Sequence, residues 1–152
     1  MNYAVILAGG RGVRFNSVNI PKQFVELTGM PILVYSMKTA QMNRNIDEIC
    51  VVTLEEYIPQ VRAWGEQYHI SKLKYITKSG KMRFDSVYNG LCAIPAAETD
   101  TVIIMTAVCP LLSQETIDKH YACIEQHAGV ITVVRATDAI TFSEDGKSAA
   151  QT

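Results

Sequence analysis

Apolar and polar positions divide the chain into short strand-like runs that alternate with helix-like segments. Five runs are predicted to be strands, at residues 3–8, 48–53, 72–77, 101–105 and 130–134. The first two are expected to be buried and the third to be more peripheral. The intervening segments have helical spacing, and their helices are predicted to begin near Pro31, near Glu55, within residues 78–94 and near Ser113. Strands that alternate with helices over the whole length predict right-handed βαβ units. The expected fold class is therefore α/β, with a three-layer, doubly wound, mostly parallel sheet.

Helical spacing also predicts which side chains face the core. On the third helix, the predicted core face is Phe84, Val87, Leu91 and Ile94. Gly90 on the same helix has two possible roles. It would either allow the helix to approach a strand closely or occupy an ordinary helical position. On the fourth helix Ser113 is the expected N-cap, and Ile117, Tyr121 and Ile124 are expected to face the core.

The first strand runs into a loop that is rich in glycine and basic residues. Its residues 3–8 contain no charge, as expected of a central strand that is buried on both faces. In open α/β sheets the ligand crevice lies at the carboxyl ends of the strands, where this chain has Gly9, Gly10 and Gly12. Glycine lets the backbone turn its N–H groups toward an anion, and Arg11, Arg14 and Lys22 add positive charge. We interpret the loop as a triphosphate cradle. The alternative is an ordinary strand-to-helix turn with solvated basic side chains.

Spacing excludes two better known phosphate-binding motifs. A dinucleotide fingerprint that starts at Gly10 and Gly12 needs a third glycine where Phe15 stands. A P-loop that ends in Gly146, Lys147 and Ser148 needs a first glycine where Thr141 stands, and no buried strand precedes it. Neither motif therefore explains the glycine loop.

Composition is that of one ordinary globular domain, expected to span residues 1–152. The chain has 152 residues, is 48% hydrophobic and carries a formal net charge of −1, which argues against a nucleic-acid coat. Its start resembles no signal peptide, and no apolar run would span a bilayer, so a cytoplasmic location without a membrane partner is expected. The four cysteines lack zinc-ligand spacing. His120 and His127 lack an evident third ligand and are expected to be solvated or capping.

The segments LAGGRGVRF and PKQF together resemble a known enzyme family. It comprises the nucleotidyltransferases that join CTP to a phosphorylated polyol, and the resemblance is greatest to 2-C-methyl-D-erythritol 4-phosphate and ribitol-5-phosphate cytidylyltransferases. A second segment, residues 78–94, matches the family in part. Ser79 stands where a glycine is usual, and Lys81 where an acidic residue is common. The resemblance implies a Rossmann-like nucleotidyltransferase fold.

The resemblance also implies roles for individual residues. Arg14 and Lys22 would be catalytic, and Asp138 would bind the polyol phosphate. The implied nucleotide-binding residues are Ala8, Gly9, Gly10, Arg11, Gly12, Gly80, Arg83, Ser86 and Thr106. Mg²⁺ is the implied cofactor, although Thr106 replaces the family's acidic residue, and no residue of this chain is assigned as a metal ligand. The implied partners are CTP, a polyol phosphate and a second copy in a homodimer. No nucleic acid is expected.

Departures from the family pattern define two further hypotheses. Thr106 and Cys109 replace an acidic residue and an arginine, and the family's domain continues beyond the position of Thr152, so the C-terminal part of the domain is expected to be missing. The alternative function is therefore a non-catalytic or truncated nucleotide-binding or dimerisation relative. A relative that uses another nucleotide is also open because of Ser79 and Lys81. The linker of residues 16–20 resembles that of ribitol-5-phosphate enzymes and favours that substrate slightly.

Overall fold

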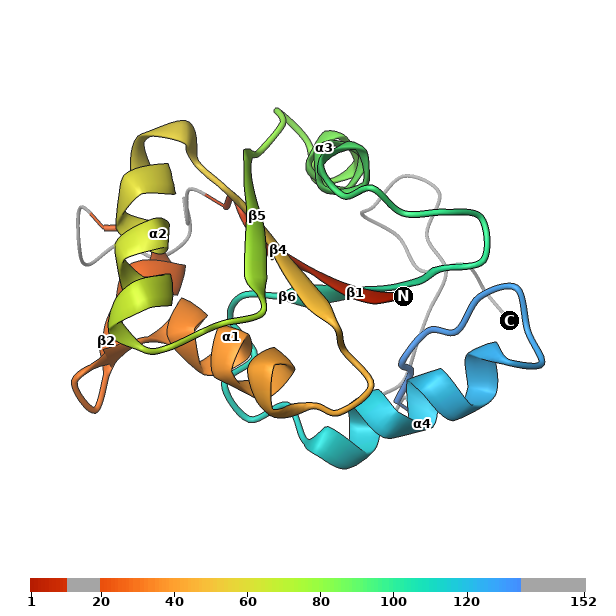
Figure 1. Ribbon diagram of the computed structural model, residues 1–152. Helices are drawn as coiled ribbons and strands as arrows, with labels where there is room; N and C mark the ends of the chain where they lie inside the picture. Colours follow the sequence, from red (N-terminus) through yellow and green to blue (C-terminus); the bar gives the residue numbers. More distant parts are fainter. Residues whose placement is uncertain (11–19, 135–152) are drawn as a thin grey trace, which may run out of the picture.

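A four-stranded parallel sheet forms the centre of the computed structural model, which describes residues 1–10 and 20–134 (Figure 1). Its order is β5 (Leu73–Lys78), β4 (Glu48–Thr53), β1 (Asn2–Ala8) and β6 (Thr101–Thr106). In the register, Ala8 of β1 lies opposite Thr53 of β4, and Leu7 lies opposite Thr106 of β6. The four corresponding strand predictions are confirmed.

Helices cover both faces of this sheet (Figure 1). The helix α1 (Ile32–Met42) connects β1 to β4, and α2 (Ile58–Gln67) connects β4 to β5. The chain then reverses direction, because α3 (Arg83–Ala93) returns it across the sheet to β6 on the other side of β1, after which α4 (Gln114–Ile124) follows. The cores place α1, α2 and α4 on one face and α3 on the other. The prediction of a three-layer, doubly wound α/β fold is confirmed, with its topological switch point between β1 and β6.

The central strand β1 is apolar throughout because both of its faces are covered. Ala4 and Ile6 belong to the core beneath α1 and α2, whereas Tyr3 and Val5 belong to the core beneath α3. These four residues are each at most 1% exposed. An alternating polar pattern would place unpaired polar groups in one of the two cores, which explains the uninterrupted apolar run.

Helix α3 packs on a different face from the predicted one. Val87 and Ile94 contact the core as expected, but Phe84 is 77% exposed and Leu91 is 41% exposed, so the prediction is wrong for these two residues. The sheet-facing side instead includes Gly90, where an added Cβ would lie 2.6 Å from a valine methyl group of β1. The prediction that Gly90 permits close approach is confirmed. The helix approaches the sheet through its smallest residues, and this rotation turns the two larger side chains outward.

The predicted fifth strand at residues 130–134 is also wrong for the described structure, where this segment has no regular secondary structure. Ile131, Val133 and Val134 are 82%, 75% and 90% exposed. A strand requires a neighbour for its backbone hydrogen bonds, and within residues 1–10 and 20–134 this segment pairs with no strand. Local apolar content indicated a preference for extended structure but could not supply the partner.

Shorter elements agree with the sequence. The Ser113 hydroxyl accepts a hydrogen bond from the Thr116 N–H at 3.1 Å, so the predicted N-cap of α4 is confirmed. Ile117 on this helix is fully buried. The strands β2 (Glu26–Leu27) and β3 (Met30–Pro31) form a small hairpin before α1. Its turn contains Gly29 with φ of +79°, a conformation that favours glycine.

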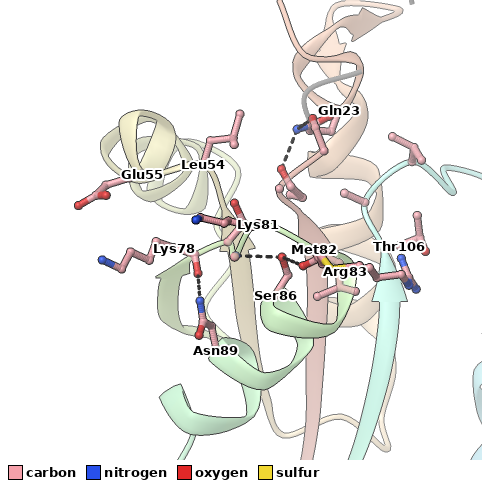
Figure 2. Close-up of a pocket in the computed structure, with 18 of the residues that line it drawn as sticks. Gln23, Leu54, Glu55, Lys78, Lys81, Met82, Arg83, Ser86, Asn89 and Thr106 are labelled. Atoms are coloured by element: carbon pink, nitrogen blue, oxygen red, sulfur yellow. Dashed lines mark hydrogen bonds between the residues drawn. The ribbon is translucent and has the colours of Figure 1, made fainter. Parts of the chain in front are cut away.

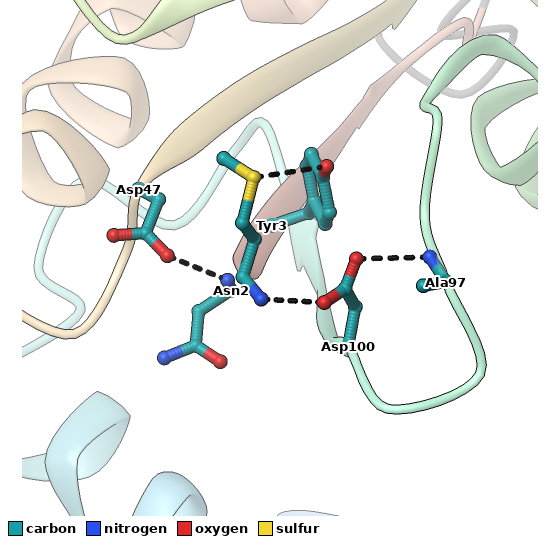
Figure 3. A network of polar contacts seen from close by, with 6 residues as sticks. Asn2, Tyr3, Asp47, Ala97 and Asp100 are labelled. Atoms are coloured by element: carbon teal, nitrogen blue, oxygen red, sulfur yellow. Dashed lines mark hydrogen bonds and ion pairs between the residues drawn. The ribbon is translucent and has the colours of Figure 1, made fainter.

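The start of β1 is fixed by a polar network at the amino edge of the sheet (Figure 3). One Asp100 carboxylate oxygen pairs with the amino group of Met1, and the other accepts the N–H of Ala97 at 2.9 Å. The Asp47 carboxylate accepts the N–H of Asn2 at 2.7 Å. The hydrogen bond from the amino terminus, followed by that from Ala97, lowers the pKa of Asp100. The network joins β1 to the segments that lead into both neighbouring strands.

Candidate functional site

A cavity of about 930 Å³ opens at the carboxyl ends of the strands (Figure 2). Five segments form its walls: the end of β1, the short helix η1 (Lys22–Phe24), the start of η2 (Glu55–Tyr57) after β4, the loop from β5 into α3, and the end of β6. All parallel strands end at this edge, so segments that are up to 100 residues apart in the sequence converge here. The edge is the one that the sequence analysis predicted from the position of the glycines.

Most of the predicted site residues meet in this cavity. Its lining includes Ala8, Gly9, Gly10, Lys22, Gly80, Arg83, Ser86 and Thr106. Four predicted residues lie outside the described part of the chain, namely Arg11, Gly12, Arg14 and Asp138. The structure thus brings together the two segments that carry the family resemblance, while the role of each residue stays a prediction.

Two of the glycines are required by close packing between the loops. A Cβ at Gly9 would collide with the Ser79 side chain, and a Cβ at Gly80 would collide with Asp85. The Ser79 N–H donates to the carbonyl of Thr53 at 2.6 Å and so keeps the end of β5 against β4. A larger residue at Gly9 would push the end of β1 away from the loop before α3, and one at Gly80 would push that loop away from the first turn of α3.

The loop before α3 is held by side chains from the first turn of that helix. The Asp85 carboxylate accepts the Met82 N–H at 2.9 Å. The Ser86 hydroxyl accepts the Gly80 N–H and donates to the Met82 carbonyl, both at 3.1 Å. These contacts fix Arg83, the first residue of α3, at the wall of the cavity. Ser86 is 7% exposed, so its observed contacts organise the loop, and a direct contact to a nucleotide base stays a prediction.

The described lining of the cavity is predominantly basic. It contains two carboxylates, Glu55 and Glu56, and four cationic side chains, which are those of Lys22, Lys78, Lys81 and Arg83. Figure 2 shows Arg83 on the side of Thr106 and Lys78 on the opposite side. Although the whole chain carries a formal charge of −1, this cavity concentrates positive charge. Such a lining suits a ligand with several phosphates.

Gln23 is a site residue to which the sequence analysis gave no role. Its side chain is 2% exposed, and its amide nitrogen donates to the carbonyls of Ala8 at 2.7 Å and Gly10 at 2.8 Å. The neighbouring Phe24 is buried and stacks on Tyr57 with ring centroids 4.2 Å apart, which anchors η1. The sequence signal that could have indicated a role for Gln23 was the order of residues in PKQF, where this polar residue directly precedes the aromatic anchor Phe24.

The described residues do not fit a resident Mg²⁺ ion. The end of β6 offers the neutral hydroxyl of Thr106, and Mg²⁺ depends on anionic oxygen ligands. Glu55 and Glu56 are both exposed and follow β4, on the other side of β1. Residues 1–10 and 20–134 contain no group of three histidine, cysteine or acidic side chains that could hold a metal ion.

The other chemically reactive side chains lie outside the cavity. Cys109 is exposed and is not among the described lining residues. The ring nitrogens Nδ1 of His120 and His127 contact the carbonyls of Thr116 and Cys123 at 2.7 and 2.9 Å, one helical turn earlier. His127, just after α4, agrees with the capping interpretation. His120 lies within α4, and its Nε2 also contacts the Thr132 hydroxyl at 2.9 Å.

The doubly wound sheet, with a glycine loop and a basic cavity at its switch point, defines an α/β protein of the nucleotide-binding class. The sequence model of one family, described as IspD: 2-C-methyl-D-erythritol 4-phosphate cytidylyltransferase, matches residues 2–152. The chain belongs to this cytidylyltransferase family, whose members are nucleotidyltransferases. The resemblance that the sequence analysis identified is confirmed.

The chain is similar to relatives named ribitol-5-phosphate cytidylyltransferase and to relatives named 2-C-methyl-D-erythritol 4-phosphate cytidylyltransferase. Ribitol-5-phosphate cytidylyltransferase from Vibrio parahaemolyticus is 35% identical over 134 residues, which cover 87% of this chain and 56% of that protein. 2-C-methyl-D-erythritol 4-phosphate cytidylyltransferase from Lachnospira eligens is 36% identical over 152 residues, which cover 100% of this chain and 66% of the relative. The chain therefore spans between about half and two thirds of the length of these relatives.

Solved structures support the fold. The crystal structure of 4-diphosphocytidyl-2C-methyl-D-erythritol synthase from Anaerococcus prevotii aligns with a TM-score of 0.78 at 22% identity and covers 97% of this chain and 61% of that one. At this identity the similarity establishes the arrangement of the sheet and helices alone. In the described part of the chain, none of the helices has the length and apolar character needed to cross a bilayer.

Proposed function

We propose that this chain supplies the nucleotide-binding part of a CTP-dependent cytidylyltransferase that transfers CMP to a polyol phosphate and releases pyrophosphate. The observation that carries the proposal is the basic cavity at the carboxyl edge of the sheet, to which the segments that carry the family resemblance contribute. The four cationic side chains of the lining outnumber its two carboxylates, and this excess of positive charge favours a ligand with several phosphates.

The proposed reaction is a single displacement at phosphorus. A phosphate oxygen of the polyol phosphate forms a bond to the α-phosphorus of CTP, and the bond from that phosphorus to the bridging oxygen of the β-phosphate breaks. The electron pair leaves with pyrophosphate. The contribution of the protein is alignment of the reactants and stabilisation of negative charge.

The proposed roles use the positions of residues in the cavity, except that of Arg14, which lies outside the described residues and rests on the family resemblance. The backbone of Gly9 and Gly10 would cradle phosphates, and Lys22, with Arg14, would neutralise charge on the phosphates in the transition state. Arg83, together with Ser86, would hold the nucleotide end from the start of α3. The N–H groups in the first turn of a helix favour nearby anions, which supports this placement.

Several parts of the proposal rest on the family resemblance. We propose ribitol 5-phosphate as the first acceptor to test and 2-C-methyl-D-erythritol 4-phosphate as the second, since relatives with both names are similar to the chain. Asp138 would contact this acceptor. We also propose a cytoplasmic homodimer. Because the described residues do not fit a resident Mg²⁺ ion, any Mg²⁺ would arrive as the counter-ion of CTP.

Calorimetric titration of the purified chain with CTP, ATP and GTP, with and without Mg²⁺, tests the nucleotide site. Lys22→Ala and Arg14→Ala should each weaken CTP binding about tenfold or more, because a hydrogen bond to a charged group contributes roughly 1.5–3 kcal/mol. Lys38→Ala, on the exposed surface of α1, is the matched control for loss of one positive charge. The proposal is wrong if CTP fails to bind, or if the control weakens binding as much as Lys22→Ala.

A non-catalytic nucleotide-binding relative is the second candidate. It is favoured by Thr106, which leaves the described end of β6 without a carboxylate in the cavity. A coupled assay of pyrophosphate release with each polyol phosphate separates the two candidates. Selective CTP binding without pyrophosphate release from either acceptor would favour the binding protein. Tighter binding of ATP or GTP than of CTP would instead indicate a relative with another nucleotide, in line with the departures at Ser79 and Lys81.

A further inference from the structure

Gln23 connects the two parts of the chain that form one wall of the cavity. Its amide nitrogen donates to the carbonyls of Ala8 and Gly10, which are 15 and 13 residues away in the sequence. Both partners are acceptors, so only the NH₂ group of the carboxamide can make these two bonds, and the orientation of the amide follows from its partners. The side chain is 2% exposed, although it belongs to a three-residue helix at the edge of the cavity.

The two hydrogen bonds determine which backbone atoms can face a phosphate. Carbonyl oxygens carry partial negative charge and would repel phosphate oxygens if they turned into the cavity. In a trans peptide the carbonyl of one residue and the N–H of the next point in opposite directions. Holding the Ala8 carbonyl on the side of Gln23 therefore leaves the Gly9 N–H directed away from Gln23. Lys22 precedes Gln23 in the same short helix, so the two Gln23 hydrogen bonds also fix the backbone of Lys22 relative to Gly9 and Gly10.

We propose that Gln23 is a positioning residue that orients the backbone of Gly9 and Gly10, together with Lys22, for binding the β- and γ-phosphates of a nucleoside triphosphate. This inference rests on the proposed function for the identity of the ligand. Gln23 acts through the backbone of Ala8 and Gly10 and does not itself need to touch the phosphates. The affinity difference between CTP and CMP isolates its effect, since the two ligands differ only in these two phosphates.

The test compares Gln23→Met with Asn43→Leu in the full chain, by calorimetric titration with CTP, CMP and inorganic pyrophosphate. Met has similar length to Gln and no donor. Asn43 is the matched control because it is also 2% exposed and also donates two hydrogen bonds from one amide nitrogen, to Gln114 and Asp118 near α4. Both variants should lose stability by urea unfolding. Gln23→Met should weaken CTP and pyrophosphate about tenfold or more and leave CMP within about threefold, whereas Asn43→Leu should change none of the three.

Two further outcomes keep this inference separate from the proposed function. If the wild type binds pyrophosphate but does not prefer CTP to ATP and GTP, the proposed function fails. A weaker pyrophosphate affinity in Gln23→Met would still support the positioning role of Gln23. If Gln23→Met binds CTP like the wild type, or loses CTP and CMP affinity equally, the positioning role is refuted. Gln23→Asn adds no charge but is one methylene shorter, so its amide nitrogen cannot reach both carbonyls, and it takes the place of the methionine variant if that variant does not fold. Retention of CTP affinity in Gln23→Asn would likewise refute the role.

Discussion

Replacement of Gly90 by alanine is the most direct test of how α3 lies on the sheet. A Cβ at Gly90 would lie 2.6 Å from Cγ1 of Val5 and 2.8 Å from Cγ2 of Val52. Comfortable contacts between carbon atoms are roughly 3.5–4.0 Å, so both contacts would be too short by about 1 Å. The two valines are fully buried, and β-branched side chains have restricted rotamers, so neither can turn aside.

The expected loss of stability follows from two opposing terms. Overpacking of a close-packed core costs roughly 1–3 kcal/mol, whereas glycine to alanine within a helix contributes about 1 kcal/mol of helix propensity. The difference between the two terms gives an expected net loss of up to about 2 kcal/mol for Gly90→Ala. Gly65→Ala in α2 is the matched control. Its Cβ would also lie 2.6 Å from one atom, but that atom is the flexible end of Leu73, so a change near zero is expected.

Urea unfolding of a double-mutant cycle measures the contact itself. Val5→Ala removes the closer methyl group and should cost about 2 kcal/mol, through lost burial and the resulting cavity. In the double variant the new Cβ occupies part of that cavity. The double variant should therefore be more stable than the sum of the single changes by about 1 kcal/mol. Helix α3 also carries Arg83 and Ser86, so CTP affinity should fall in Gly90→Ala and recover in the double variant.

Additive single and double changes would show that Gly90 and Val5 do not share the contact. A gain of stability in Gly90→Ala, as helix propensity alone would give, would show that α3 lies farther from the sheet than described. Either result would refute the explanation for the exposed positions of Phe84 and Leu91, because that explanation depends on approach through the smallest face of the helix.

Four other expectations follow from individual residues. The hydrogen-bond partners of Asp100 lower its pKa, so ionised Asp100 should stabilise the fold at pH values above about 3.9, the ordinary carboxyl pKa. This contribution should disappear as the pH falls through the lowered pKa, and Asp100→Asn should remove that pH dependence in urea unfolding. Burial raises the pKa of Cys50 to about 12, so iodoacetamide at neutral pH should modify it much more slowly than the exposed thiols, and equal rates by mass spectrometry would contradict its buried position; the exposed thiols are Cys92, Cys109 and Cys123. Ser113→Ala should cost about 1 kcal/mol in urea unfolding through loss of the α4 cap, and a change near zero would show that the cap contributes little. Thr106→Asp should make CTP binding depend more strongly on Mg²⁺ in calorimetry than in the wild type, and an unchanged dependence would show that this position does not meet the metal-bound phosphates.

Much of the candidate site could be predicted because its residues lie at the ends of strongly patterned strands. An uncharged run such as residues 3–8 requires cover on both faces, and its end then falls at the carboxyl edge of a parallel sheet. The spacing of Gly9, Gly10 and Lys22 identified the segment next to that edge. Gln23 was missed because its importance lies in two backbone carbonyls more than a dozen residues away, and a sequence pattern does not specify such partners.

The sequence alone determined the type of the four strands of the sheet and their succession along the chain, because hydrophobic spacing and turn residues are local properties. Tertiary structure decided the rest. Gly90 faces the sheet and Phe84 faces outward because close packing favours the smallest helix face, which spacing alone does not rank. Residues 130–134 form no strand in the described structure although their composition favours one, because a strand depends on a neighbour to receive its hydrogen bonds.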